Sequence, residues 1–126
     1  MSSRHSSFAP AGWPTITPRI VVEDARGLVE FLRQVFGAGG EYSEDRPAVI
    51  KIGDSLVMIS DAGARRSMTA FLYVYVADAD AVYQRAINAG ARSLEPPLDT
   101  PYGDRRAMVE DGWGNTWQIA THRETE

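Results

Sequence analysis

The sequence predicts an α+β protein in which one strand–helix–strands module occurs twice. The segments Ile20–Gly37 (IVVEDARGLVEFLRQVFG) and Val74–Gly90 (VYVADADAVYQRAINAG) both contain an apolar strand end, an Asp-Ala pair and an amphipathic stretch that ends at glycine. A Gly-Asp-Ser turn at 53–55 and a Gly-Asn-Thr turn at 114–116 then each precede a short apolar run. Because two such copies would fold alike, we expect the functional site to lie where they face each other.

Length and composition limit the functions open to the chain. With 126 residues, 44% of them hydrophobic, it is long enough for one domain with a sizeable core and too short for two. A net charge of −4 does not provide the basic surface that nucleic acid requires, and the lack of cysteine excludes disulfides and thiolate chemistry. No apolar run approaches the roughly 18 residues of a membrane span, and residues 1–14 lack the apolar core of a signal peptide. We therefore expect a cytoplasmic protein that binds neither nucleic acid nor a membrane.

The chain divides into an arm and one domain. Residues 1–14 are rich in Ser, Ala and Pro, which predicts an N-terminal arm outside the domain. Phe8 and Trp13 are unusual in a free tail, so we expect the arm to dock on its own domain or on a second subunit. The domain at 15–122 has three parts: module one at 15–60, a linker at 61–69 and module two at 70–122.

The first module begins with a strand pattern at 15–22. Asp24 is placed to cap a helix that ends at Gly37. The buried stripe of this helix is expected to consist of Leu28, Val29, Leu32, Val35 and Phe36. Three short strands, at 41–45, 48–52 and 56–60, are expected to follow it.

The second module repeats this order. An opening strand is predicted at Phe71–Val76 and a helix at Asp78–Asn88 that stops at Gly90. The interval 95–103 contains two prolines and is expected to be a long loop, a candidate lid or rim. The remaining strands are predicted at 91–94, 105–110 and 116–121.

These features together resemble the vicinal oxygen chelate superfamily, which includes glyoxalase I, bleomycin-resistance proteins and extradiol dioxygenases. The resemblance rests on the double module with its helix-opening Asp24 and Asp78, on the string 102–106 (YGDRR) and above all on the string 111–122 (DGWGNTWQIATH). The sequence is most similar to the PhnB-like branch, and one departure is Gly112, where the family more often has proline. The resemblance implies two βαβββ modules that form a curved, eight-stranded mixed sheet around a cavity, with the helices outside.

The resemblance also implies that a metal site has been lost. Metal-using members bind a divalent ion with one His on each opening strand and one carboxylate on each closing strand. The corresponding positions here are Thr17, Met58, Phe71 and Gln118. None of these side chains supplies an imidazole or a carboxylate, so we expect no metal and no other cofactor. His5 and His122 are interpreted as surface histidines.

Side chains on the expected cavity face favour a ligand site. If the alternate apolar residues of the second opening strand face its helix, then Phe71, Tyr73 and Tyr75 face the concavity. Arg19 occupies a matching position in module one, where its guanidinium would stack on the rings and pair with a carboxylate or phosphate. Two alternatives stay open, namely that the rings fill a collapsed core and that Arg19 is a solvated charge.

Two classes of function follow. The first is a metal-independent protein that binds a small, aromatic and anionic molecule for sequestration, resistance or sensing. Its candidate binding residues are Thr17, Arg19, Met58, Phe71, Tyr73, Tyr75, Arg106 and Gln118. The second is a lyase-type or isomerase-type enzyme that acts on a small carbonyl or aromatic substrate, with Glu110 or Tyr75 transferring the proton. The alternative role of Glu110 is an ion pair with Arg106. A homodimer is expected in either case, because family members close the cavity by pairing modules within or between subunits.

Overall fold

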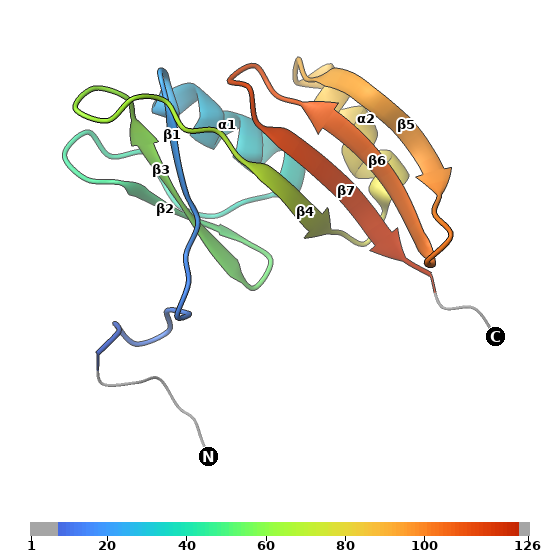
Figure 1. Ribbon diagram of the computed structural model, residues 1–126, viewed down its shortest axis with the longest axis horizontal. Coiled ribbons are helices and arrows are strands. Elements are labelled where there is room, and N and C mark those ends of the chain that lie inside the picture. The colour runs from blue at the N-terminus through green and yellow to red at the C-terminus, as the bar shows by residue number, and fades with distance from the viewer. Residues whose placement is uncertain (1–7, 124–126) are drawn as a thin grey trace.

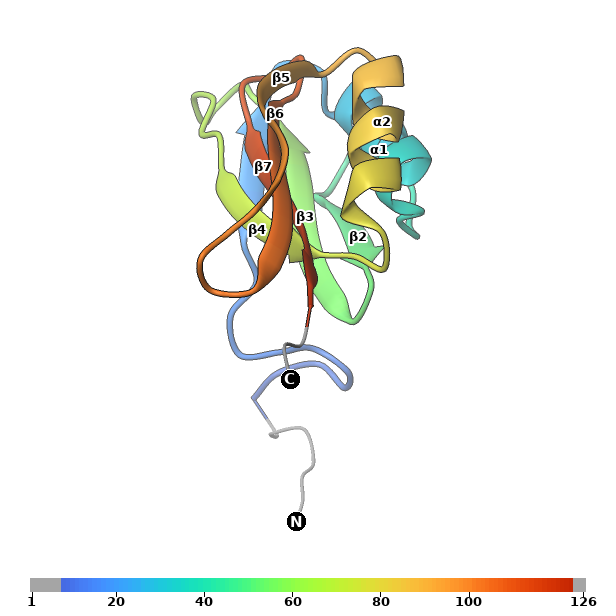
Figure 2. The same ribbon diagram turned by 90° about the vertical axis from the view of Figure 1, so that its right-hand side faces the viewer.

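The computed structural model describes residues 8–123, which form two β-sheets side by side with two helices packed on one face (Figures 1 and 2). The first module contains β1 (Arg19–Val22), α1 (Ala25–Phe36), β2 (Ala48–Ile52) and β3 (Ser55–Asp61). The second contains β4 (Phe71–Tyr75), α2 (Ala79–Asn88), β5 (Arg92–Asp99), β6 (Asp104–Glu110) and β7 (Thr116–His122). The predicted α+β fold with a repeated module is therefore confirmed.

Each opening strand runs parallel to the last strand of its own module. The first sheet has the order β1-β3-β2 and the second has the order β4-β7-β6-β5. Arg19 lies opposite Met58 in the parallel β1–β3 pair, and Tyr73 lies opposite Gln118 in the parallel β4–β7 pair. The other pairs are antiparallel, so both sheets are mixed. This shared arrangement places the opening strands β1 and β4 at sheet edges.

The helices begin and end where the sequence predicts. The Asp24 side chain accepts a hydrogen bond from the backbone amide of Gly27 (3.1 Å), and the Asp78 side chain accepts one from Ala81 (3.2 Å). Both are N-caps, which satisfy amides that have no partner within the helix. Gly37 ends α1 in the left-handed region with φ 66°, a conformation that glycine adopts without strain.

The core lies between the sheets and the helices. Neither helix in the described residues is long and apolar enough to cross a membrane. Their apolar stripes instead pack on the sheets, and burying each large apolar side chain contributes about 2 kcal/mol. The largest fully buried apolar side chains are Ile20, Val21, Val22, Leu28, Leu32, Val35, Ile50, Ile59, Val109, Trp117 and Ile119.

The first sheet has one strand fewer than expected. Residues 41–45 form no strand, and only an isolated bridge between Gly39 and Lys51 marks where a fourth strand would pair. Two polar side chains of this stretch bond to each other instead, because Ser43 Oγ donates to Asp45 at 2.8 Å, a local contact that favours a turn. The described residues therefore contain seven strands, whereas eight were predicted.

The expected loop at 95–103 is largely a strand. β5 continues to Asp99 and includes Pro96 and Pro97, so only a short turn at 100–103 remains as a rim. Proline is tolerated here because β5 is the edge strand of its sheet, where a missing N–H need not break a ladder. Register shifts on both sides of Glu95 mark the bulges that accommodate this segment.

Candidate functional site: a cavity between the modules

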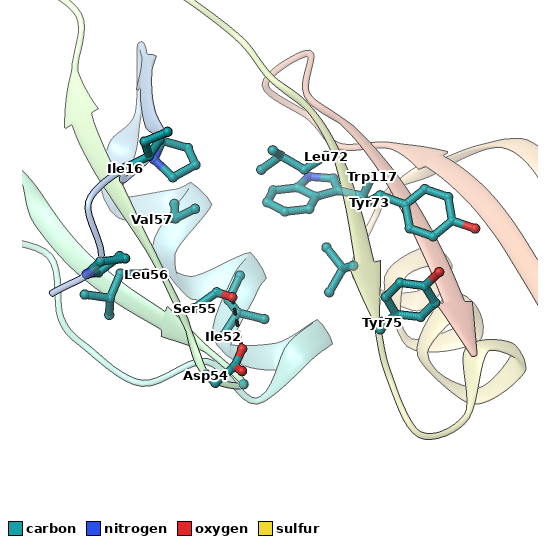
Figure 3. Close-up of a pocket in the computed structure, with 14 residues that line it drawn as sticks. Ile16, Ile52, Asp54, Ser55, Leu56, Val57, Leu72, Tyr73, Tyr75 and Trp117 are labelled. Carbon is teal, nitrogen blue, oxygen red and sulfur yellow. Dashed lines mark hydrogen bonds between the residues drawn. The ribbon is translucent and has the colours of Figure 1, made fainter. Parts of the chain in front are cut away.

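A cavity of about 460 Å³ lies between the facing edges of the two sheets (Figure 3). Module one contributes the end of β2, the turn that follows it and the start of β3, and the chain preceding β1 also contributes to the wall. Module two contributes β4 and one tryptophan of β7. The lining residues are Pro14, Ile16, Pro18, Ile52, Gly53, Asp54, Ser55, Leu56, Val57, Leu72, Tyr73, Val74, Tyr75 and Trp117.

The cavity exists because the two sheets do not join. Within residues 8–123, β1 pairs only with β3 and β4 pairs only with β7, so the edges that face each other share no ladder. One backbone bridge crosses near this gap, between Val21 and Met68. The remaining space is closed mainly by aliphatic side chains and the indole of Trp117, which makes the cavity predominantly apolar (Figure 3).

The aromatic residues of β4 share the face that the alternation predicts. Leu72 and Val74 pack against the core, whereas Phe71, Tyr73 and Tyr75 point to the helix-free side. The two tyrosine rings lie 5.3 Å apart between centroids; both residues border the cavity, but their rings extend away from it (Figure 3). Phe71 is 67% exposed and is not part of the lining. These rings therefore do not fill a collapsed core.

Both tyrosine hydroxyls point away from the cavity and bond to one buried carboxylate (Figure 3). Asp104 Oδ2 accepts a hydrogen bond from Tyr73 at 2.5 Å and one from Tyr75 at 2.9 Å. Its Oδ1 lies 2.8 Å from His122 Nδ1. The Asp104 side chain is only 1% exposed, so this cluster of three partners is what compensates its removal from water.

These contacts determine the protonation of the cluster. The hydrogen bonds from Tyr73 and then from His122 hold the pKa of Asp104 below its ordinary value. Burial and the bond to Asp104 raise the pKa of Tyr73, and the bond to Asp104 is the main cause that raises the pKa of Tyr75. At neutral pH the cluster is therefore a carboxylate held by two neutral phenols. Tyr75 is consequently unsuited to the role of general base.

Glu110 and Arg106 do not form the ion pair that the sequence predicted. Arg106 donates from Nη2 to Glu95 and from Nη1 to the Tyr102 hydroxyl at 3.1 Å. Glu110 instead accepts a bond from Arg92 Nη2 at 2.5 Å, because these two residues lie directly opposite each other in the β5–β6 pair. The strand register across the bulges of β5 decides these partners, and the sequence did not reveal that register.

Most other sequence-predicted residues lie outside the cavity lining. Arg19 Nε donates to Ser60 Oγ at 3.1 Å. Of the eight candidate binding residues, Tyr73 and Tyr75 line the cavity. The six that do not are Thr17, Arg19, Met58, Phe71, Arg106 and Gln118. Ile16 and Pro18, the neighbours of Thr17, line it in its place.

The positions that correspond to the metal ligands of the family do not suit a metal ion. Thr17, Met58, Phe71 and Gln118 offer no imidazole and no carboxylate. Within residues 8–123, no three His, Cys, Asp or Glu side chains lie close enough together to hold one. The residues at these positions therefore do not fit the divalent ion that metal-using members of the family bind.

Sequence reasoning missed Asp104 and His122. The string 102–106 included Asp104 only as part of the family resemblance, and His122 was interpreted as a surface histidine. The His122 side chain is indeed exposed, but it lies directly opposite Asp104 in the antiparallel β6–β7 pair. Counting back from the Gly-Asn-Thr turn at 114–116 along both strands brings these residues together. That hairpin register is the signal that could have found them.

The Asp-Gly-Trp-Gly-Asn-Thr-Trp string is a loop organised by one aspartate. Asp111 Oδ1 accepts hydrogen bonds from the backbone amides of Trp113 and Asn115, both at 2.9 Å. Its Oδ2 accepts bonds from Asn115 Nδ2 at 2.9 Å and from Trp117 Nε1 at 2.8 Å. Asn115 Oδ1 in turn accepts a bond from the Ala70 amide at 2.9 Å, which ties the loop to the start of β4. These side chains stabilise the fold that the motif indicates.

Comparison with known sequences agrees with the fold and the motif. The family model described as Glyoxalase/Bleomycin resistance protein/Dioxygenase superfamily matches residues 14–119. The chain belongs to this superfamily. Uncharacterized proteins of Mycobacterium bovis and Mycobacterium tuberculosis H37Rv are each 30% identical to it over 124 residues. The alignments cover 84% of this chain, with 82% of the M. bovis protein and 73% of the M. tuberculosis protein.

Solved structures of other proteins share the fold. TioX from Micromonospora sp. ML1 is 24% identical with a TM-score of 0.67, and the match covers 85% of this chain and 98% of TioX. The fosfomycin resistance protein FosX from Mesorhizobium loti is 24% identical with a TM-score of 0.65, covering 86% and 91%. A glyoxalase/bleomycin resistance protein/dioxygenase family enzyme from Burkholderia phytofirmans PsJN is 22% identical with a TM-score of 0.72, covering 82% and 94%. At these identities the likeness shows the fold alone.

Proposed function

We propose that this chain is a metal-independent binding protein that encloses a small, flat, mainly apolar organic molecule between its two modules. The observation that carries the proposal is the cavity of about 460 Å³, in which aliphatic side chains of module one face Leu72 and Trp117 of module two (Figure 3). This volume lies within the range of roughly 300–1,000 Å³ that is typical of small-molecule sites. Contact with an aromatic ring contributes about 1 kcal/mol beyond the burial of apolar area.

The ligand we propose is uncharged rather than anionic. The sequence favoured an anion because Arg19 was expected beside the rings, but Arg19 is not a lining residue and bonds to Ser60. The charged side chain in the lining is Asp54, at one end of the cavity (Figure 3). A carboxylate or phosphate in this cavity would therefore meet a like charge and lose its hydration, which lowers its affinity.

A matched pair of fluorescent probes tests both parts of the proposal. N-phenyl-1-naphthylamine is neutral, and 1-anilinonaphthalene-8-sulfonate has the same ring system with one sulfonate. We expect saturable binding of the neutral probe and weaker binding of the anionic one. Ser55→Trp should block the cavity and remove this binding, because Ser55 lines it, whereas Ser67→Trp in the exposed linker should not. No saturable binding by the native chain, or equal binding by both variants, would rule the proposal out.

Sequestration of a toxic compound in the cytoplasm is the role that we propose for this binding. A protein with the same fold is named as a fosfomycin resistance protein, which supports a role of this kind. We also propose that the chain belongs to the PhnB-like branch, supported by the string 111–122. Expression of the chain in a sensitive bacterium should raise the inhibitory concentration of planar aromatic toxicants. An unchanged inhibitory concentration would refute this role. It would not refute the binding site, which the fluorescent probes test separately.

One observation favours an enzyme as the second candidate. His122 Nδ1 lies 2.8 Å from the buried carboxylate of Asp104, while the His122 side chain is 57% exposed. A carboxylate that orients an accessible imidazole is a recurring arrangement for a general base. A lyase-type or isomerase-type reaction would use His122 in place of Glu110 or Tyr75. Hydrolysis of p-nitrophenyl acetate is a simple probe, and His122→Gln should reduce it to the level of free solution. An unchanged rate in that variant would remove the enzymatic candidate.

A further inference from the structure

One edge of β4 pairs with β7, and its other edge, which we call the free edge, faces the cavity. At the two ends of β4, the Thr116 amide donates to the Ala70 carbonyl at 2.9 Å and the Val76 amide donates to the Ala120 carbonyl at 2.8 Å. Successive residues of a strand point their N–H and C=O groups to opposite edges. The even-numbered residues of β4 therefore bond to β7, and the odd-numbered residues point these groups to the free edge.

Tyr73 and Tyr75 are the odd-numbered residues of β4 that line the cavity. Their rings extend away from it to reach Asp104, so the part that they present to the cavity is the backbone (Figure 3). Within residues 8–123, no backbone group of another residue bonds to the N–H or C=O of either tyrosine. Two donors and two acceptors thus line an otherwise apolar space, which favours a ligand that can pair with them.

A short extended peptide has the groups that this edge requires. In antiparallel pairing, a residue opposite Tyr73 would exchange both backbone hydrogen bonds with it, and the next such pair, at Tyr75, lies two residues away. Three peptide residues, spanning roughly 7 Å at about 3.3 Å per residue, are therefore enough to satisfy both tyrosines. The middle residue would lie opposite Val74, with its side chain on the face where Val74 packs against the core. An apolar side chain suits that position.

We infer that the cavity selects ligands with an extended, uncharged amide backbone, which pair with the free edge of β4 as a short added strand. This inference rests on the proposed binding function and names the chemical class of its ligand. Addition of a strand to an open sheet edge is a general mode of peptide recognition, in which backbone bonds supply affinity and side-chain pockets supply specificity. The opposite wall, formed by the chain before β1 and the turn after β2, limits the added strand to a short segment.

The first test changes the ligand and leaves the protein intact. The neutral peptide N-acetyl-Ala-Leu-Ala-amide should displace N-phenyl-1-naphthylamine from the cavity. Methylation of both alanine nitrogens removes the two N–H groups that would pair with β4, so it should weaken the displacement by about tenfold or more. Methylation of the leucine nitrogen is the matched control, because that N–H points away from β4. The control peptide should bind as the parent peptide does.

The second test locates the peptide on the protein. Tyr75→Pro removes an N–H from the free edge without removing a bond to β7, and proline is tolerated in this orientation. It should weaken peptide binding by about threefold to tenfold, and by more than Tyr75→Ala, which loses the same ring but keeps the N–H. Val49→Pro is the control. The Lys51 amide donates outward to Gly39 at 2.9 Å, so Val49 also points its N–H to the outer edge of the first sheet, away from the cavity. This variant should bind the peptide as the native chain does.

Amide hydrogen exchange needs no variant. The amides of Tyr73 and Tyr75 should exchange faster than those of Leu72 and Val74 in the free protein, and the peptide should slow the exchange of both tyrosine amides. A peptide that fails to displace the bound probe, equal effects of methylation at alanine and leucine, or tyrosine exchange that saturating peptide leaves unchanged would each overturn the inference and leave the binding function standing. Absence of probe binding by the native chain would instead refute the function on which the inference rests.

Discussion

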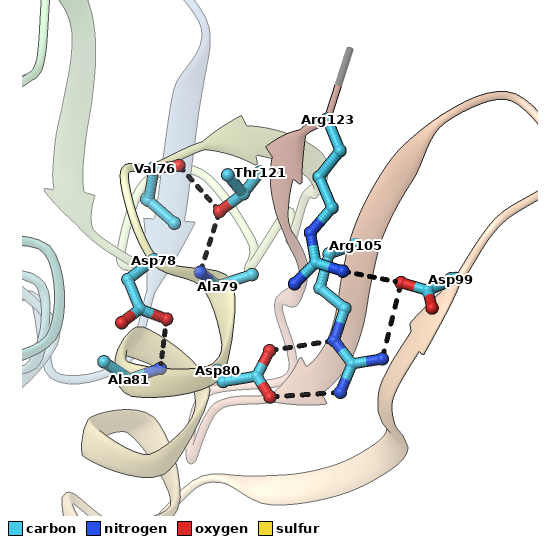
Figure 4. A network of polar contacts seen from close by, with 9 residues as sticks. All are labelled: Val76, Asp78, Ala79, Asp80, Ala81, Asp99, Arg105, Thr121 and Arg123. Atoms are coloured by element: carbon cyan, nitrogen blue, oxygen red, sulfur yellow. Dashed lines mark hydrogen bonds and ion pairs between the residues drawn. The ribbon is translucent and has the colours of Figure 1, made fainter. Parts of the chain in front are cut away.

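The backbone amide of Ala79 donates a hydrogen bond to Thr121 Oγ1 at 2.8 Å, which joins the first turn of α2 to the end of β7 (Figure 4). The Thr121 hydroxyl in turn donates a hydrogen bond to the carbonyl of Val76, also at 2.8 Å. The first module has the same link in other residues, since the Ala25 amide donates to Asp61 Oδ1 at 2.9 Å. In both modules the end of the closing strand therefore helps to cap the helix.

Replacing Thr121 with valine should destabilise the protein by about 1–2 kcal/mol, because the shape is kept while two backbone groups lose their partner. Urea unfolding measures this free energy. Thr116→Val is the control on the same strand, since the Thr116 hydroxyl makes no hydrogen bond within residues 8–123. Equal losses in the two variants would contradict the capping role of Thr121.

Arg105 connects α2 to the sheet through charge and geometry together. Its Nε and Nη2 atoms donate to the two carboxylate oxygens of Asp80 at 3.0 and 3.1 Å, and Asp99 bridges it to Arg123 (Figure 4). Arg105→Lys keeps the charge but cannot reproduce the fork. It should lower the urea midpoint by less than Thr121→Val does, and the loss should shrink in 1 M salt. A loss that does not depend on salt would indicate packing instead.

Asp111→Ala should be the most destabilising of these substitutions, by about 3 kcal/mol. The change leaves four donors without their acceptor in a site where the aspartate is buried. Near-ultraviolet circular dichroism should report the change as well, because Trp117 is one of the donors. A fully folded Asp111→Ala variant with native stability would show that the turn forms without this residue.

The stability difference between the native chain and Asp104→Asn should depend on pH. The folded-state pKa of Asp104 lies below its unfolded value, so the carboxylate contributes stability above about pH 4. That contribution is lost as the pH falls through the folded-state pKa. Urea unfolding at pH 6 should therefore separate the two proteins more than unfolding near pH 3. A constant difference across this range would mean that the Asp104 charge does not contribute.

The full chain should sediment as a dimer at micromolar concentration. Phe71 is 67% and Tyr75 62% exposed on the helix-free face of the second sheet, where Tyr102 is exposed as well. Burial of such rings favours association of copies of the chain. Phe71→Ser should raise the dissociation constant, with Ser67→Thr in the linker as a neutral control. A native chain that sediments as a monomer would refute the dimer.

The sequence predicted the parts of the fold that depend on local chemistry. Asp24 and Asp78 cap their helices because an aspartate before an amphipathic stretch can satisfy a free amide without help from distant residues. The alternation on β4 was equally readable, and it placed Tyr73 and Tyr75 on the correct face. The structure of residues 41–45 could not be predicted in this way, because a short polar segment forms a strand only where a neighbouring strand pairs with its backbone.

The sequence predicted the candidate site only where its residues lie on a single strand. Ile16 and Pro18 line the cavity because the chain before β1 crosses the gap between the sheets, and that path depends on tertiary packing. The partnership of Asp104 with His122 depends on the register of a hairpin, and its contact with the tyrosines depends on side chains long enough to cross a strand. Such relationships leave little trace in local patterns.

The two prolines of β5 limit how copies of this chain can associate. Pro96 and Pro97 have no N–H to donate, and they lie on the outer strand of the second sheet. A further strand could not form a continuous ladder along that edge, which protects it from edge-to-edge aggregation. Copies that meet through the second sheet are therefore directed to its open face, where the exposed rings of Phe71 and Tyr75 lie.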